Sequence, residues 1–167
     1  MNQLTPTNEG RALSAVETAG TVQAADEQVF VTVYVAGQLF GMPVERVQDI
    51  LVPESIAKIP LAPPEVAGAI NLRGRIVTVI NMRKRLGLQP KTNAKQVMCV
   101  TVEQGNELYS LMVDSVGNVL TLPVGRIESN PSTLDPRWRS ISNGVVRLDK
   151  ELLVVMDVDI FLNFNTG

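Results

Sequence analysis

The side chains that most often perform catalysis are scarce in this chain. Its 167 residues contain no histidine and a single cysteine, Cys99. The lack of histidine excludes Ser-His-Asp and Cys-His catalysis and histidine metal ligands. Cys99 lies in the alternating run VMCVTV, which favours a small buried hydrophobe over a reactive thiol. The sequence also has no phosphate-binding loop, no dinucleotide-binding glycine pattern, no CxxC pair and no nucleophile elbow.

Two neighbouring carboxylates, Asp157 and Asp159, are the best candidates for a metal site or an acid–base pair. The alternative is the start of a helix, where one acid caps free amides and the other interacts favourably with the helix dipole. No further cluster of oxygen ligands accompanies them, which favours the helix start. We therefore predict a non-enzymatic protein with no catalytic, cofactor-binding or metal-binding residues.

Basic residues gather in the segment 66–102, which contains no acid. It holds seven of the fifteen lysines and arginines of the chain: Arg73, Arg75, Arg83, Lys84, Arg85, Lys91 and Lys95. Small β-barrels with such a charge bias can bind single-stranded nucleic acid, but they also need aromatic stacking platforms. No aromatic residue lies between Phe40 and Tyr109. A nucleic-acid-binding barrel is thus a remote alternative to a solvated basic face or a patch for an acidic protein partner.

The charges near the middle of the chain belong to a predicted β-hairpin. The run AINLRGRIVTVINMRKRL (69–86) indicates two strands joined by a tight turn at Arg73 and Gly74, since glycine supplies the positive φ that such turns need. Asn81 is then expected to cap a short helix, and Gly87 to end it.

An internal repeat shows which charges the fold does not require. Residues 145–162 align on the hairpin at an offset of 76, and residues 100–120 align on 31–51 at an offset of 69. Arg73 corresponds to Asp149, and Asp49 to Asn118. Positions that serve a partner need not match between copies, so Arg73 and Asp49 are candidate functional residues, with incidental surface charges as the alternative.

The elements around the hairpin predict an all-β chain with short helices. Residues 29–35 and 39–44 are expected to form a first hairpin. The spacing of Val44, Val47 and Leu51 predicts one or two helical turns, with Asp49 pointing away from their face. Residues 56–59 are expected to form a short strand. About five strands per copy suit two small barrels, one from about 28–88 and one from about 96–163, with exchange of strands between them left open. They would pack into one domain, 27–164, after a disordered polar tail, 1–26. No stretch is long and apolar enough for membrane insertion.

The run VAGAINLRGRIVTVINMRKRLGL resembles the CheW family of chemotaxis adaptors, whose pattern is roughly G-x-x-N-L-R-G-x-I-x-P-x-x-D-L-R. The resemblance extends over about residues 28–163 and departs from the pattern at Thr78 and Asn81. It implies two five-stranded SH3-like β-barrels. It also implies a cytoplasmic adaptor, associated with membrane receptor arrays through its partners, that couples chemoreceptor (methyl-accepting chemotaxis protein) tips to the regulatory domain of the CheA histidine kinase.

The resemblance also assigns residues. It implies that Arg73 and Asp49 contact the receptor or support that contact, together with Asn71 and Gly74 of the same N-L-R-G motif. By analogy, a kinase contact is expected near Val47 and Val97. Two alternatives stay open within the family: an isolated regulatory domain of a kinase, and an adaptor of a chemosensory pathway that does not control flagella.

Overall fold

The computed structural model describes residues 26–90 and 97–163. The predicted tail, 1–26, lies outside this range except for Asp26. The strands are β1 (Glu27–Val35), β2 (Gln38–Pro43), β3 (Val47–Leu51), β4 (Val66–Leu72), β5 (Arg75–Asn81), β6 (Met98–Gln104), β7 (Glu107–Val113), β8 (Ser115–Pro123), β9 (Ser142–Arg147) and β10 (Leu152–Met156). The short helices are η1 (Val44–Arg46), α2 (Met82–Arg85), η2 (Val124–Arg126), α3 (Pro136–Arg139) and α4 (Val158–Leu162). None of these helices is long and apolar enough to cross a membrane.

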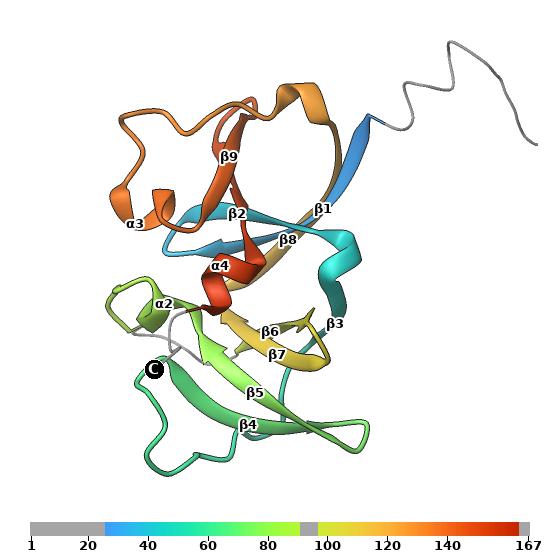
Figure 1. The fold of residues 1–167 in the computed structure, drawn as a ribbon, viewed down its shortest axis with the longest axis vertical. Coiled ribbons are helices and arrows are strands. Elements are labelled where there is room, and N and C mark those ends of the chain that lie inside the picture. Colours follow the sequence, from blue (N-terminus) through green and yellow to red (C-terminus); the bar gives the residue numbers. More distant parts are fainter. Residues whose placement is uncertain (1–25, 91–96, 164–167) are drawn as a thin grey trace, which may run out of the picture.

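The strands form two five-stranded sheets, each a small barrel. The first barrel has the order β8-β1-β2-β10-β9 and the second has the order β3-β6-β7-β5-β4. The two barrels lie one above the other, with α2 and α4 beside the junction (Figure 1). Replacing each strand of the first order by its repeat counterpart yields the second order, so the two barrels are built alike.

Strand exchange joins the two repeat copies. Hairpin β1–β2 of the first copy pairs with β8 and β10 of the second, and hairpin β6–β7 of the second copy pairs with β3 and β5 of the first. A barrel therefore does not correspond to one continuous unit, 28–88 or 96–163. The exchange satisfies the edges of both hairpins, which would otherwise expose unpaired backbone groups.

The largest hydrophobic cluster joins the two barrels. It combines Phe40 and Val33 of the first barrel with Val100 and Leu111 of the second, all of them fully buried. Separate smaller clusters fill the interior of each barrel. Trp138, in the long connection before β9, packs edge-on against Phe40 with ring centroids 5.3 Å apart. This shared cluster packs the two barrels against each other.

The prediction for residues 44–51 was wrong in part. Only η1 is helical, and Val47 begins strand β3, which pairs with β6. Val47 and Leu51 are four residues apart, which suits one face of a helix, but in β3 a bulge between Val47 and Asp49 places Val47 opposite Val102 and Leu51 opposite Cys99, on opposite faces of the strand. Asp49 lies opposite Thr101 and therefore on the same half-buried side of β3 as Leu51, not away from it as predicted.

The strand expected over residues 56–59 is also absent, since only Ala57 forms a bridge, to Ala69. The central hairpin is confirmed and β4 starts three residues earlier than predicted. Its turn residues have φ of 54° at Arg73 and 85° at Gly74, the two positive values of a type I′ turn. Asn81 caps α2 by accepting a hydrogen bond from the Lys84 amide, as predicted.

Candidate functional site

The tip of the β4–β5 hairpin is held by its own side chains. The Asn71 Oδ1 atom accepts a hydrogen bond of 3.0 Å from the Gly74 amide, across the turn. A Cβ atom at Gly74 would meet nothing within 4 Å, so the left-handed φ is the reason for glycine here, not crowding. The predicted residues Asn71, Arg73 and Gly74 thus form one rigid, exposed turn.

Arg73 and Asp49, the two charges selected by comparing the repeat copies, form an ion pair. The Arg73 Nη2 atom lies 3.0 Å from Asp49 Oδ2, and the two side chains are 77% and 21% exposed. The other Asp49 oxygen, Oδ1, accepts a hydrogen bond of 2.9 Å from the Ile50 amide. Asp49 is therefore fixed by its strand and orients a guanidinium whose remaining donors face solvent.

A pocket of about 380 Å³ opens next to this ion pair. Its lining includes Leu51, which lies two residues beyond Asp49, and Asn71, which anchors the turn. Ile70 and Val52 add apolar surface, and Glu54 adds a carboxylate. An exposed cation beside a partly apolar hollow can recognise a protein surface that offers a carboxylate and an apolar side chain.

The two residues predicted for kinase binding, Val47 and Val97, are not brought together. Val47 pairs with Val102 at one end of the β3–β6 ladder, whereas Val97 precedes the other end of β6. The separation is roughly 16 Å along the strand. Val47 packs against the cluster between the barrels, and Val97 against the interior of the second barrel. Both are half-buried, so each offers only part of its side chain to a partner.

The basic segment is not one continuous patch, because several of its arginines are used inside the molecule. Arg83 forms a two-pronged ion pair with Asp114, with contacts of 2.9 and 2.7 Å. This pairing raises the pKa of the Arg83 guanidinium. Asp114 also accepts a hydrogen bond of 2.8 Å from the Ala36 amide, so it ties α2 to the β1–β2 turn.

Two further arginines bind across the junction between the barrels. Arg85 donates a hydrogen bond of 2.8 Å to the Phe161 carbonyl, and its guanidinium lies over the Phe161 ring. Arg46 pairs with Asp159 at 2.7 Å, which lowers the pKa of that carboxyl group. Sequence patterns gave no signal for these pairs, because their members are far apart in the chain.

The other candidates for chemistry have structural partners. Asp157 caps α4 by accepting from the Ile160 amide at 3.0 Å, and Asp159 faces Arg46, so the two carboxylates point to different partners. Across residues 26–90 and 97–163 we find no group of three residues arranged to hold a metal ion. Cys99 is fully buried, and burial raises the pKa of its thiol to about 11.

Comparison with known proteins decides the family. The CheW-like domain matches residues 29–164, which is most of the chain. The chain belongs to the CheW family. Its function is that of a chemotaxis adaptor.

CheW relatives from distant bacteria align over most of their length. The chain is 26% identical over 147 residues to the chemotaxis protein CheW of Treponema pallidum, covering 80% of this chain and 81% of the relative. It is 24% identical over 143 residues to the chemotaxis protein CheW of Bacillus subtilis, covering 86% and 92%. Each alignment covers at least 80% of this chain, so the resemblance is not limited to one motif.

A solved CheW structure has the same fold. The crystal structure of the scaffolding protein TtCheW from Thermoanaerobacter tengcongensis superposes with a TM-score of 0.74 at 27% identity, covering 84% of this chain and 95% of that one. The CheW fold of two five-stranded SH3-like barrels, expected from the sequence, is therefore confirmed.

Proposed function

We propose that this CheW-family adaptor couples the cytoplasmic tips of chemoreceptors to the regulatory domain of the CheA histidine kinase, without catalysing a reaction. Its place would be the cytoplasm, at membrane receptor arrays, which it joins through these partners. The observation that supports the receptor contact is the exposed Arg73 guanidinium, held by Asp49 at 3.0 Å on a rigid turn.

Arg73 suits recognition of a receptor carboxylate. With 77% of its side chain exposed, it keeps donors for two parallel hydrogen bonds to a partner. Charge-assisted bonds of this kind contribute about 1.5 to 3 kcal/mol. Asn71 and Gly74 support the contact by fixing the turn, and Asp49 supports it by orienting the guanidinium.

The kinase contact is proposed to involve apolar surface near Val47 and Val97. Because these residues lie at opposite ends of the β3–β6 ladder, each would mark a separate contact. Charge introduced at either position should weaken binding to the kinase regulatory domain if that contact forms. Unchanged kinase affinity for a folded Val47→Glu or Val97→Glu variant would remove the corresponding assignment.

The receptor contact is tested by titrating a purified receptor cytoplasmic fragment with Arg73→Ala, Arg73→Lys and Asp49→Ala. Arg73→Ala should weaken binding by about tenfold or more. Lysine should substitute poorly, since it keeps the charge but loses the planar fork. Asp49→Ala should have an intermediate effect, because the guanidinium stays but is no longer held.

Arg147→Ala is the matched control. Arg147 forms a similar exposed ion pair with Glu128, at 3.3 Å, on the first barrel. The Arg147→Ala variant should bind receptor and kinase with the affinity of the parent chain. Folded Arg73 variants with parental receptor affinity would show that Arg73 is only a surface charge.

A further inference from the structure

The connection between β3 and β4 holds a leucine in an unusual conformation. The Ala62 amide donates to the Ile59 carbonyl at 3.3 Å, which closes a tight turn with Pro60 and Leu61 at its centre. Leu61 has φ of +63° and a fully exposed side chain. A proline followed by a residue with positive φ is the pattern of a type II turn, whose second central position normally holds glycine. Strain of this kind, combined with exposure of a large apolar side chain, is typical of a functional site.

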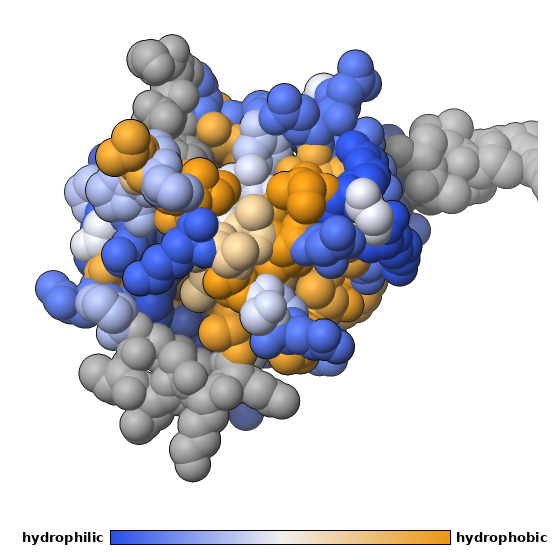
Figure 2. Space-filling model, turned by 90° about the horizontal axis from the view of Figure 1, so that it is seen from below, coloured by the Kyte–Doolittle hydropathy of each residue, from blue (hydrophilic) through white to orange (hydrophobic). Residues whose placement is uncertain are grey.

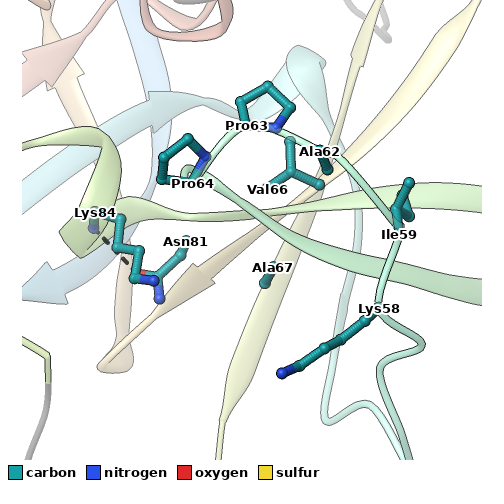
Figure 3. A pocket seen from close by; sticks show the side chains of 9 residues that line it. All are labelled: Lys58, Ile59, Ala62, Pro63, Pro64, Val66, Ala67, Asn81 and Lys84. Atoms are coloured by element: carbon teal, nitrogen blue, oxygen red, sulfur yellow. Dashed lines mark hydrogen bonds between the residues drawn. The ribbon is translucent and has the colours of Figure 1, made fainter.

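A pocket of about 300 Å³ lies beside this turn. Figure 3 shows its apolar wall, which comes from Ile59, Pro63, Pro64 and Val66. Seen from below, this end of the second barrel has an apolar area bordered by hydrophilic side chains (Figure 2). Leu61 does not line the pocket but stands between two residues that do, Ile59 and Ala62.

Two lysines give the pocket its charge. Lys58 and Lys84 belong to its lining and both are exposed (Figure 3). Within the part of the chain that the structure describes, neither lysine forms an ion pair. The neighbouring arginine, Arg85, differs from them, because it interacts electrostatically with Glu65 and donates to the Phe161 carbonyl. The pocket therefore combines apolar walls with two available positive charges.

We propose that Leu61 and this lysine-flanked pocket form a docking site for an acidic protein segment that carries apolar side chains. The carboxylates of the segment pair with Lys58 and Lys84, one of its apolar side chains enters the pocket, and Leu61 packs against another. A rigid turn suits this role, because Pro60 limits the conformational entropy that Leu61 loses on binding.

Charge decides against a second copy of this chain as the occupant. Two copies that met at this surface would bring four lysines together without an acid from the pocket lining, and juxtaposed like charges disfavour association. Nucleic acid is disfavoured because the lining contains no aromatic side chain on which a base could stack.

The docking site is separate from the receptor contact proposed for Arg73. Arg73 lies at the tip of the β4–β5 hairpin, whereas Val66 and Asn81 of the pocket lie at its base, where Val66 pairs with Ile80. Six strand residues, or roughly 20 Å, separate the two surfaces. The inference therefore does not depend on the role of Arg73.

The test uses the isotope-labelled full chain and a short synthetic peptide in which glutamates flank two leucines. The amide resonances of Lys58, Ile59, Ala67 and Lys84 should shift on titration, and the affinity should fall as salt is added. A peptide with serines in place of the leucines and a peptide with lysines in place of the glutamates should each bind at least about tenfold more weakly.

Variants separate the two parts of the site. Leu61→Gly should weaken binding by about tenfold, a loss typical of one truncated apolar anchor, while the chain melts at the same or a higher temperature because the strain at φ +63° is relieved. Lys84→Glu and Lys58→Glu should weaken binding and reduce its salt dependence. Val124→Ser and Lys150→Glu, at exposed positions of the first barrel, should change neither the affinity for the peptide nor its salt dependence.

Several results would overturn the proposal. They are the absence of saturable shifts at these amides, equal binding of the lysine peptide, or parental affinity in Leu61→Gly and both lysine variants. Self-association of the chain that Leu61→Gly abolishes would point to a second copy instead. Binding to anionic phospholipid vesicles, but not to the glutamate–leucine peptide, would point to a membrane surface.

Discussion

Gly68 and Gly144 occupy the same position in the two barrels. They are 76 residues apart, the offset of the hairpin repeat, and have φ of +149° and +150°. Each precedes a residue that forms a backbone bridge to a loop, Ala69 to Ala57 and Val145 to Glu128. A Cβ atom at Gly68 would collide with the Ala57 carbonyl oxygen, and one at Gly144 would lie 2.6 Å from the Glu128 carbonyl oxygen. The fold thus needs a glycine at this point of each barrel.

Replacing either glycine with alanine should destabilise the chain. Gly68→Ala and Gly144→Ala each combine an unfavourable φ with a backbone collision, so the free energy of unfolding should fall by roughly 2 kcal/mol or more. Urea denaturation measures it. Gly125→Ala is the control, because a Cβ atom there meets nothing within 4 Å, and its effect should be within about 0.5 kcal/mol. Equal stability of all three variants would contradict the requirement for glycine at these two positions.

The repeat also predicts paired core effects. Val79 and Val155 are buried inside the second and first barrel respectively, at equivalent repeat positions. Truncation to alanine should cost about 1 to 3 kcal/mol at each. The equivalent leucines, Leu72 and Leu148, are only half-buried, so their truncation should cost less than the sequence pattern alone suggests. Chemical denaturation of the four single variants checks the ranking, and a cost at one valine but not the other would count against it.

Arg73 and Arg83 should differ in their contribution to stability. Arg73 is mostly exposed, and such surface pairs contribute about 0 to 1 kcal/mol, so Arg73→Ala should barely change the melting temperature. Arg83 and Asp114 are only 20% and 17% exposed and bind through two contacts. Arg83→Ala should therefore cost about 1 to 3 kcal/mol. A larger loss for Arg73→Ala would show that the turn ion pair has a structural role.

Acid should weaken the cap of α3. The Arg137 side chain, helped by the Arg137 amide, lowers the pKa of Asp135 from 3.8 to about 2. A lowered folded-state pKa adds stability that is fully present above the unfolded value and is lost as the pH falls through the folded value. Asp135→Asn, which keeps an acceptor at the cap, should lower the melting temperature at neutral pH. The difference should shrink between about pH 4 and pH 2. A difference that stays constant down to the lowest pH would contradict this assignment.

Cys99 should be unreactive in the folded protein. Its thiol is fully buried and its pKa is raised to about 11, so very little thiolate forms at neutral pH. A thiol reagent such as dithionitrobenzoate should not modify the native chain at pH 7 and should modify it once urea unfolds it. Fast labelling without denaturant would show that the second barrel opens locally.

Much of the local structure could be predicted from the sequence. Gly74 and Gly87 mark backbone positions with positive φ, and Asn81 and Asp157 mark helix starts, because each of these signals acts over only three or four residues. The internal repeat predicted two similar barrels. Comparing its copies also selected Arg73 and Asp49, which the structure places 3.0 Å apart.

Only the tertiary structure decided how the strands are shared. An apolar strand can pair with any edge of suitable length, and the pairing of β2 with β10 and of β7 with β5 depends on packing across the whole domain. The same limit applies to Asp49, because the spacing of Val47 and Leu51 fits a helix, and the β-bulge that sets the side of Asp49 forms only when β3 pairs with β6. It applies also to Arg83 and Asp114, because an ion pair between residues 31 positions apart exists only once the fold has brought them together.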